Sequence, residues 1–271
     1  NNHVFVFIIA RTPLKMRNSL REELWQISKK SLQAQTSKNW KAIIVGDTSS
    51  DELSDEFFIT LNYDDYPKRE KLEIALDYLK NNPSFKHDYL IRFDDDDVFS
   101  ETILSDIEKL PTTYDCYFDE YHTYVDSVYL KLSQKKNSWI ANTAIHKYEH
   151  AITVCGKSNI PLLIQDHSEY WHIYYSNKNV YKAKRSNPVY YRILTPFSIT
   201  SSKNQEAGAI DWSKHLQYLK GYGPWVCLSN NYSFYLNFIR ITNLYFSDKP
   251  TINKIYWVFS FMKFMKNKFF G

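Results

Sequence analysis

Residues 89–97 read Tyr-Leu-Ile-Arg-Phe-Asp-Asp-Asp-Asp, a short apolar run that leads directly into four consecutive carboxylates. The apolar part has the length and composition of a strand buried in a sheet. In open α/β sheets, ligands bind beyond the carboxyl ends of the strands, which is where the four aspartates would lie. This stretch therefore predicts both the fold class and the place of a binding site.

Two further apolar runs predict buried strands of a parallel sheet, Val-Phe-Val-Phe-Ile-Ile-Ala at 4–10 and Trp-Lys-Ala-Ile-Ile-Val at 40–45. Between them, residues 19–35 place apolar side chains at helical spacing, and strand, helix, strand implies a right-handed crossover. The same patterns predict a short strand at 57–63 and a helix at 69–80. We expect a mixed, mostly parallel central sheet flanked by helices.

After about residue 110 the pattern predicts short strands at the edge of a mixed sheet. The candidates are 114–118, 121–130, 139–144 and 170–175. A helix is expected from Asn204 or Gln205 to Leu219, where Gly221 and Pro224 follow. Residues 252–270 alternate aromatic residues and lysines at helix-like spacing and predict a C-terminal helix.

The composition restricts the class of protein. Aromatic residues make up 17% of the 271 residues, which suits stacking on sugars but also an aromatic-rich core. A net charge of +4 is too mild for nucleic-acid binding. The three cysteines, widely spaced, fit neither a disulfide framework nor a zinc site and favour a reducing cytoplasm. With no signal peptide and no apolar run of about 18 residues, we expect a cytoplasmic protein without a membrane span.

Four adjacent carboxylates raise one another's pKa unless a cation neutralises them. Mn²⁺ or Mg²⁺ takes oxygen ligands and usually keeps water and phosphate oxygens beside one or two protein carboxylates. Residues two apart on an extended segment point the same way, so Asp94 and Asp96 are the favoured metal pair. Asp97 is a further metal candidate, and Asp94 and Asp95 are expected to face the ligand. A solvated acidic loop or helix N-terminus is the alternative, which the preceding strand disfavours.

In this order the segments resemble the nucleotide-sugar glycosyltransferases of GT-A fold, especially the large inverting family 2. The matching segments are Arg11-Thr12-Pro13, Ser-Leu-Gln-Ala-Gln-Thr at 31–36, the second strand with its turn at 40–51, and the acidic run with Ile103-Leu104 behind it. Each segment alone is a weak signal, but four in the correct order are specific. The resemblance covers roughly residues 4–110.

Within that group the chain resembles bacterial rhamnosyltransferases. Arg92 precedes the aspartates, and residues 171–180 match a Trp-containing strand that leads to a His-Gly-x-Asn-Val turn. Ser176 and Asn177 replace the His and Gly of that turn, so the resemblance provides no histidine metal ligand here. Gly46 likewise replaces the first of two aspartates that the family often has at the end of its second strand.

The resemblance implies roles for the matched positions. Arg11 and Thr12 would line the pocket for base and ribose, and Asp47 would face the nucleobase or ribose. Arg69 or Lys71, at the start of a helix, would neutralise the diphosphate, although a solvated helix end explains both equally well.

Inverting transfer also requires a base for the acceptor hydroxyl. Asp166 is the first candidate, with Glu169 nearby, in a loop before the expected strand at 170–175. Glu120, His146 and His172 remain alternatives, since a lone loop carboxylate is more often only solvated. An enzyme that retains configuration would need no such base at this place.

We therefore expect a GT-A-like catalytic domain over residues 1–200, with a nucleotide-sugar-binding half at 1–110 and an acceptor half at 111–200. A helical C-terminal extension, 201–271, would follow. Its segment 253–270 would either touch the inner face of the cytoplasmic membrane or pack against the domain.

The expected activity is metal-assisted transfer of a sugar from a nucleotide-diphosphate donor. The acceptor would be a saccharide or lipid-linked saccharide in surface-glycan synthesis, such as capsule or lipopolysaccharide. The alternatives are a non-catalytic nucleotide- or glycan-binding domain of the same fold and a metal-dependent nucleotidyltransferase. Zinc-protease spacing, a glycine-rich phosphate loop and a nucleophile elbow are all absent from the sequence.

Overall fold

A computed structural model describes residues 3–54, 56–84, 86–111, 113–136, 142–166, 169–196, 212–229 and 232. Within these residues the main element is a seven-stranded sheet in the order β12-β6-β9-β4-β1-β2-β3. Its strands are β1 (Phe5–Ala10), β2 (Trp40–Val45), β3 (Phe58–Leu61), β4 (Tyr89–Phe93), β6 (Cys116–Phe118), β9 (Ala144–Lys147) and β12 (Val180–Lys182). Neighbouring strands are parallel except that β9 runs antiparallel to both β4 and β6.

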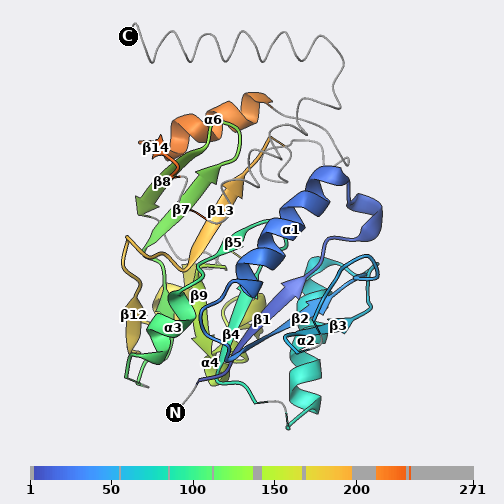
Figure 1. The fold of residues 1–271 in the computed structure, drawn as a ribbon. Coiled ribbons are helices and arrows are strands. Elements are labelled where there is room, and N and C mark those ends of the chain that lie inside the picture. The colour runs from blue at the N-terminus through green and yellow to red at the C-terminus, as the bar shows by residue number, and fades with distance from the viewer. Residues whose placement is uncertain are drawn as a thin grey trace, which may run out of the picture.

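A second sheet continues from the first in the order β14-β8-β7-β13-β5 (Figure 1). Its strands are β5 (Val98–Phe99), β7 (Tyr121–Asp126), β8 (Lys131–Lys136), β13 (Tyr190–Leu194) and β14 (Val226–Cys227), and a separate hairpin joins β10 (Val154–Cys155) to β11 (Ile160–Pro161). β5 follows β4 after only the four aspartates. The acidic run therefore lies where the two sheets meet.

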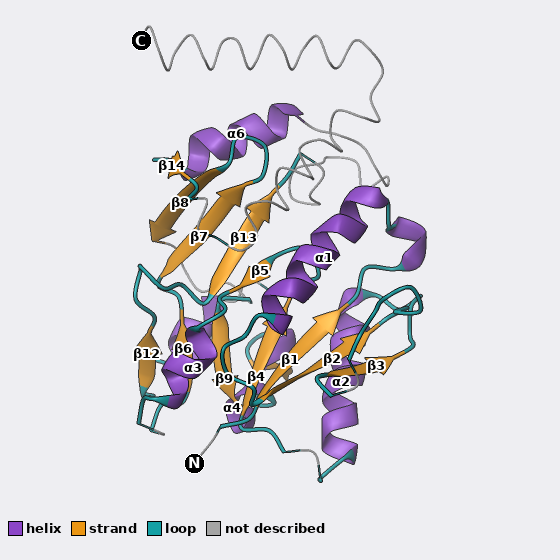
Figure 2. Ribbon diagram, viewed as in Figure 1, coloured by secondary structure: helices purple, strands orange, loops and turns teal. Residues whose placement is uncertain are grey.

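Helices cover the sheets from outside, as Figure 2 shows. They are η1 (Leu14–Met16), α1 (Ser19–Gln33), α2 (Lys68–Asn81), α3 (Ile103–Glu108), α4 (Tyr148–Ala151), η2 (Leu162–Ile164), α5 (Glu169–Tyr174) and α6 (Trp212–Tyr222). Alternate residues of β1 enter different cores: Phe7 packs in the cluster that includes α1 and α3, and Ile8 packs in the cluster that includes α2 and η2. Burial on both faces explains why this strand reads as a continuous apolar run.

The predicted mixed, mostly parallel sheet flanked by helices is confirmed. All six elements predicted before residue 100 are present, with ends within a few residues of the expected ones. The expected strand at 114–118 is β6, and the one at 121–130 is β7, which ends at Asp126. β8 was not predicted, because its sequence Lys-Leu-Ser-Gln-Lys-Lys carries little apolar signal.

One predicted strand is wrong: residues 170–175 belong mostly to helix α5. Trp171 and Tyr175, four residues apart, both pack in the core cluster beside β6 and are 0% and 3% exposed. That spacing places the two rings on one face of a helix. The aromatic content favoured a strand, whereas the spacing of the two buried rings favoured the helix that forms.

The structure describes only some of the residues for which elements were predicted after residue 138. The first half of the expected strand at 139–144 lies outside the described residues, and in the second half only Ala144, where β9 begins, is in a strand. The helix expected from 204 or 205 is described from Trp212, as α6, and residues 252–270 lie outside the described part. β14 lies in the segment predicted as a helical extension and pairs with β8, whereas the division at residue 200 stays a prediction.

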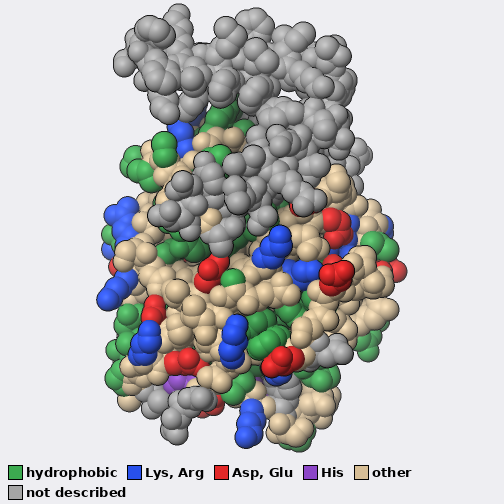
Figure 3. Space-filling view, in the orientation of Figure 1, with side chains coloured by type: hydrophobic (Ala, Val, Ile, Leu, Met, Phe, Trp, Pro, Cys, Tyr) green, Lys and Arg blue, Asp and Glu red, His purple; other side chains and the backbone are tan. Residues whose placement is uncertain are grey.

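Two surface observations bear on possible partners. On the face drawn in Figure 3, acidic and basic side chains are interspersed and not gathered by sign. Among the described helices, none is long and apolar enough to cross a membrane.

Candidate active site

The parallel strands end at one edge of the main sheet, since Ala10 pairs with Val45 and Ile9 pairs with Phe93. A cavity of about 490 Å³ lies beyond the ends of β1 and β4, as expected for an open α/β sheet. Its charged lining residues are Arg11, Arg21, Lys68, Lys71, Arg92, Arg192, Asp94, Asp95, Asp96, Asp97 and Asp166. The cavity therefore gathers six basic and five acidic residues in one place.

The four aspartates divide into two pairs. The side chains of Asp94 and Asp96 are each 24% exposed, whereas Asp95 and Asp97 are each 5% exposed. The segment is a turn and not the extended strand end that was assumed, but the predicted alternation holds. Asp94 and Asp96 are therefore the two members of the run that remain open to a ligand.

Asp95 is used inside the protein. Its Oδ2 accepts hydrogen bonds from the Thr12 backbone N–H (2.7 Å) and Arg11 Nη1 (2.9 Å), and its Oδ1 accepts one from Thr12 Oγ1 (3.0 Å). Burial raises the pKa of Asp95, but the Arg21 and Arg11 guanidinium groups outweigh it and lower the pKa overall. Arg11, Thr12 and Asp95 thus contact one another and join the ends of β1 and β4; all three also line the cavity, and their contacts with a ligand stay predictions.

Arg11 is held on its other sides as well. Its side chain is 0% exposed, its Nη2 lies 2.8 Å from Glu22 Oε2, and its guanidinium lies 4.7 Å from the Trp25 ring. A buried guanidinium with carboxylate and aromatic partners is a structural group first. Arg11 therefore lines the cavity with a side chain that is fully buried among protein partners.

Asp97 connects the acidic run to the second sheet. Its Oδ1 accepts a hydrogen bond from the Ile193 N–H (2.7 Å), and its Oδ2 accepts one from the Tyr190 hydroxyl. Burial, together with the charges of Asp96 and Asp94, raises the pKa of Asp97 well above its usual value. Because both oxygens hold β13, Asp97 is a weaker metal candidate than the sequence suggested.

Asp94 and Asp96 each accept hydrogen bonds from side chains of other segments. Lys68 Nζ and Asn142 Nδ2 each donate to Asp94 at 2.6 Å, and Arg21 Nη1 donates to Asp96 at 2.6 Å. Burial opposes the charge of Asp94, but Lys68 and Arg92 lower its pKa overall. For Asp96, burial and its two acidic neighbours raise the pKa in spite of Arg21. Negative charge at Asp96 is thus incompletely balanced by the protein.

These residues fit a divalent cation. Carboxylate oxygens of Asp94, Asp96 and Asp97 lie within 4.8 Å of one another. An all-oxygen set suits Mg²⁺ or Mn²⁺, which need only one or two protein carboxylates when phosphate oxygens complete the shell. After burial, the negative charges of neighbouring aspartates raise the pKa values of Asp96 and Asp97, and a cation would offset this repulsion.

Of the other predicted donor-binding residues, only Lys71 lines the cavity. Lys71 is 1% exposed, and its Nζ donates to the Arg11 carbonyl at 2.8 Å, with burial lowering its pKa. Arg69 pairs with Glu73 at 3.2 Å on the outer surface of α2 and does not line the cavity. Asp47 accepts two hydrogen bonds from Ser49 and also does not line it. On α2, Lys68 instead of Arg69 faces the cavity.

Asp166, the first candidate for the base, does line the cavity. Its side chain is 75% exposed, and its Oδ1 accepts a hydrogen bond from Arg92 Nη2 at 2.6 Å. Glu169 begins α5, but its side chain lies outside the description. Asp166 is therefore the predicted base that the fold brings beside the aspartate run.

The three alternative bases are placed away from the cavity. Glu120 and His172 line a different surface pocket, where Glu120 pairs with Lys182 at 3.0 Å. His146 is 0% exposed, and burial lowers its pKa to about 3, so it stays neutral inside the core. None of the three lines the cavity that holds Asp94 and Asp96.

The sequence analysis missed four polar residues of the cavity: Arg21, Lys68, Asn142 and Arg192. Burial opposes the charge of Arg21, yet Asp96 and Asp95 raise its pKa overall. Arg21 carried a local signal, since it follows the helix N-cap Asn18 by three residues and lies in the first turn of α1, the first α-helix after β1. Asn142 and Arg192 carried none, because only the tertiary fold brings them to the aspartates.

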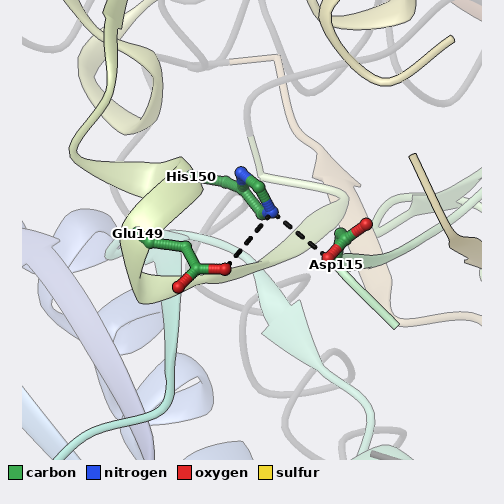
Figure 4. Close-up of side chains that lie close together, drawn as sticks. All are labelled: Asp115, Glu149 and His150. Atoms are coloured by element: carbon green, nitrogen blue, oxygen red, sulfur yellow. Dashed lines mark ion pairs between the residues drawn. The ribbon is translucent and has the colours of Figure 1, made fainter. Parts of the chain in front are cut away.

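A second group of metal-type ligands, Asp115, Glu149 and His150, lies outside the cavity (Figure 4). His150 Nε2 is 3.3 Å from Asp115 Oδ1 and 3.8 Å from Glu149 Oε1. His150 Nδ1 contacts the Tyr174 hydroxyl at 2.9 Å, and Lys147 pairs with Glu149 at 3.2 Å. An ion-pair network with partners from the protein accounts for this group.

Comparisons with known proteins show a likeness in structure only. No protein-family model and no curated protein matches the sequence. Among solved structures, Staphylococcus aureus TarS in complex with UDP-GlcNAc aligns at 11% identity and a TM-score of 0.47, covering 88% of this chain and 70% of that one. A structure of TarS residues 1–349 aligns at 11% identity and a TM-score of 0.44, covering 70% of this chain. This chain spans 60% of that TarS chain.

The glycosyltransferase GlyE of Streptococcus pneumoniae aligns at 11% identity and a TM-score of 0.39, covering 81% of this chain and 64% of that one. All these TM-scores are below 0.5. The GT-A-like fold therefore stands on the sheet topology and on the acidic turn after β4.

Proposed function

We propose that this chain is a glycosyltransferase that takes a sugar from a nucleoside diphosphate donor with the help of Mn²⁺ or Mg²⁺. The observation that carries the proposal is the exposed pair Asp94 and Asp96, beyond the end of β4 in a cavity rich in basic side chains. Binding modules and nucleotidyltransferases can share such a pair, and the experiment below separates them.

Charge supports a diphosphate as the ligand. The cavity lining has one more basic residue than acidic ones, and a divalent cation would add further positive charge. A diphosphate that contacts both the cation and the basic side chains would balance this excess. Lys68 is the best placed of these residues, because it is the first residue of α2, next to the cavity, and its side chain is 48% exposed.

Arg21 and Arg192 would contact the donor from two other sides. Arg21 comes from the first turn of α1, and Arg192 comes from β13 of the second sheet. Burial opposes the charge of Arg192, but Asp97 and neighbouring tyrosines raise its pKa overall, so it stays a cation. Three cations from three elements would fix the orientation of a diphosphate, which a single lysine cannot do.

In the reaction, Asp94 and Asp96 would hold the metal, which supplies Lewis-acid stabilisation of the leaving diphosphate. Asp166 would accept the proton of the acceptor hydroxyl as that oxygen attacks the sugar carbon, and configuration would invert. Lys68 and Arg21, released from their carboxylates, would neutralise the departing nucleoside diphosphate. The acceptor would approach beside Asp166, since this carboxylate is largely exposed.

For the acceptor we keep the expectation of a saccharide or lipid-linked saccharide in surface-glycan synthesis at the inner face of the cytoplasmic membrane. The family resemblance of the sequence supports this class. UDP sugars are the first donors to test, because TarS was solved with UDP-GlcNAc.

The test is release of nucleoside diphosphate from a panel of UDP, GDP and dTDP sugars with Mn²⁺, before and after chelation by EDTA. We expect turnover with at least one donor, its loss with EDTA, and its loss in Asp96→Asn. Asp77→Asn is the matched control, because Asp77 pairs with Lys80 on the exposed surface of α2. Binding of a nucleotide without turnover would favour a non-catalytic module, and release of pyrophosphate from a sugar phosphate and a nucleoside triphosphate would favour a nucleotidyltransferase.

A further inference from the structure

Arg92 connects the strand that carries the aspartates to the loop that carries Asp166. It is the fourth of the five residues of β4, and it is 3% exposed. Its Nη1 donates to the carbonyls of Ile164 and Gln165, both at 3.2 Å, and its Nη2 donates to Asp166 Oδ1 at 2.6 Å. One planar guanidinium thus holds both the backbone and the side chain of the loop.

Burial and further hydrogen bonds also fix the segment that precedes Asp166. Leu162, Leu163 and Ile164 of η2 are all buried, at 3% exposure or less. Gln165 is 5% exposed, and its Nε2 donates to the carbonyls of Cys155 (2.8 Å) and Ile160 (3.1 Å) in the hairpin β10–β11. The chain up to residue 165 is therefore anchored, and Asp166 is the first residue of the segment with an exposed side chain.

The contact with Arg92 leaves half of the carboxylate available. Oδ1 faces the guanidinium, and Oδ2 has no hydrogen-bond partner among the described residues. A base requires a carboxylate held in one direction with an oxygen free to take the proton. A hydrogen bond from a buried, rigid donor provides such an orientation at little entropic cost.

We propose that Arg92 is the positioning residue of the catalytic base: its guanidinium aims the Asp166 carboxylate into the cavity. This inference rests on the proposed function. Arg92 acts through Asp166 and does not serve as a ligand of the donor, because its three side-chain hydrogen bonds to described residues all go to residues 164–166.

A contrasting role is that Arg92 binds the donor, since it lines the same cavity and lies close to Asp94. The two roles predict different kinetics. Loss of a donor ligand weakens nucleotide binding, whereas loss of a positioning residue lowers turnover and leaves binding unchanged. A double-mutant cycle between positions 92 and 166 separates them further, because residues that act as a unit are not additive.

The experiment compares Arg92→Met, Arg92→Lys, Asp166→Asn and the double variant Arg92→Met/Asp166→Asn. UDP release from UDP-GlcNAc with Mn²⁺ measures turnover, and calorimetry with UDP and Mn²⁺ measures binding. We expect Arg92→Met and Asp166→Asn each to lose about 100-fold or more in turnover, the double variant to lose no more than the larger single loss, and the UDP affinity to stay within about threefold. Arg92→Lys keeps the positive charge but not the planar guanidinium with its several donors, so its loss of turnover should be smaller than that of Arg92→Met.

Hydrogen exchange of the backbone at 162–166 is the second readout, and it needs no turnover. Arg92→Met should raise exchange there about tenfold or more, whereas the control Arg185→Met, at an arginine that contacts Gln134 on the surface, should leave it unchanged. Additive losses in the double variant, a tenfold weaker UDP affinity in Arg92→Met, or unchanged exchange would each overturn the proposal. A wild-type chain that turns over no donor of the panel would count against the proposed function, and exchange alone would then decide the role of Arg92 in holding the loop.

Discussion

The aspartates 94–97 show how one residue type takes two different roles within four positions. Asp95 and Asp97 accept hydrogen bonds from Thr12 and from β13 with both oxygens, whereas Asp94 and Asp96 contact cations at the rim of the cavity. Strand alternation favoured Asp94 and Asp96 as a metal pair, and these two are the more exposed members although the segment forms a turn. The sequence was not sufficient to predict the partners of the buried pair, which are as many as 96 positions away along the chain.

We expect substitutions in the two pairs to have different effects. Asp94→Asn and Asp96→Asn should weaken Mn²⁺ binding about tenfold or more and leave the thermal unfolding midpoint nearly unchanged, since these side chains are partly exposed. Asp95→Asn should lower the free energy of unfolding by about 3 kcal/mol, because it leaves buried Arg11 without its full counter-charge. Manganese titration by electron paramagnetic resonance and urea unfolding measure the two effects. Equal loss of stability in all three single variants would contradict this division.

His146 provides a pH-dependent test of the core. Burial lowers its pKa from 6.5 to about 3 in the folded protein, so between these values the unfolded chain binds more protons. Stability from this group is therefore complete above pH 6.5 and is lost as the pH falls below it. His146→Phe removes the titrating group, so the loss of stability at low pH should be absent. It also removes the hydrogen bond between His146 Nδ1 and the Tyr175 hydroxyl (2.8 Å).

We therefore expect His146→Phe to be less stable than the wild type at pH 7 and the difference to shrink by about 2 kcal/mol at pH 5. Urea unfolding of both proteins at the two pH values measures it. A difference that is independent of pH would show that His146 titrates normally in the folded chain.

At the scale of elements, prediction succeeded where one local pattern was sufficient. The strands β1, β2 and β4 and the helices α1 and α2 are long, and each buries an uninterrupted face, so composition and spacing identify them. α5 and β8 are short or polar and take their form from neighbours: α5 packs Trp171 against His146, and β8 pairs with both β7 and β14. Tertiary contacts therefore decide the second half of the chain.

The turn after β2 explains why glycine replaces the first of the family's two aspartates. Gly46 has a φ of +143°, a region that side chains rarely adopt, and a Cβ there would lie 2.8 Å from Arg11 Cβ. The ends of β1 and β2 approach each other closely here, so Gly46 packs against Arg11, which hydrogen-bonds to Asp95. The departure from the family pattern is thus a packing requirement of this chain.

Gly46→Ala should lower the free energy of unfolding by about 2 kcal/mol or more, from backbone strain together with displacement of Arg11. Gly221→Ala is the control, because nothing lies within 4 Å of its added Cβ and alanine is favoured over glycine in helix α6. Urea unfolding of both variants measures the difference. A neutral result for Gly46→Ala would show that the turn adopts another conformation.

At the scale of the whole molecule, two sheets meet at the acidic run and complete the cavity together. Tyr190, Arg192 and Ile193 of β13 reach the aspartates from the second sheet. Nothing in the order of the motifs predicts this, because the family resemblance ends near residue 110. The first half of the chain supplies the proposed metal residues and the diphosphate-binding cations Arg21 and Lys68. The second half supplies Arg192, the proposed base and the wall on the acceptor side.

The segment 253–270 lies outside the described residues, and its membrane contact stays a prediction from its aromatic residues and lysines. We expect the full chain to float with vesicles rich in phosphatidylglycerol and a chain that ends at Pro250 to stay in the soluble fraction. Equal flotation of the two would contradict a membrane role for this segment. High salt should weaken the flotation if the lysines contribute to it.

The central claim is that Asp94 and Asp96 bind a nucleoside diphosphate together with a divalent cation. Thermal unfolding with UDP, GDP or dTDP, in the presence of Mn²⁺ or of EDTA, tests it most directly, because a ligand of the folded state raises the midpoint with concentration. We predict that at least one nucleotide raises the midpoint only with Mn²⁺, and that Asp96→Asn abolishes the shift while Asp77→Asn retains it. No metal-dependent shift with any nucleotide, or the same shift in Asp96→Asn, would contradict the claim.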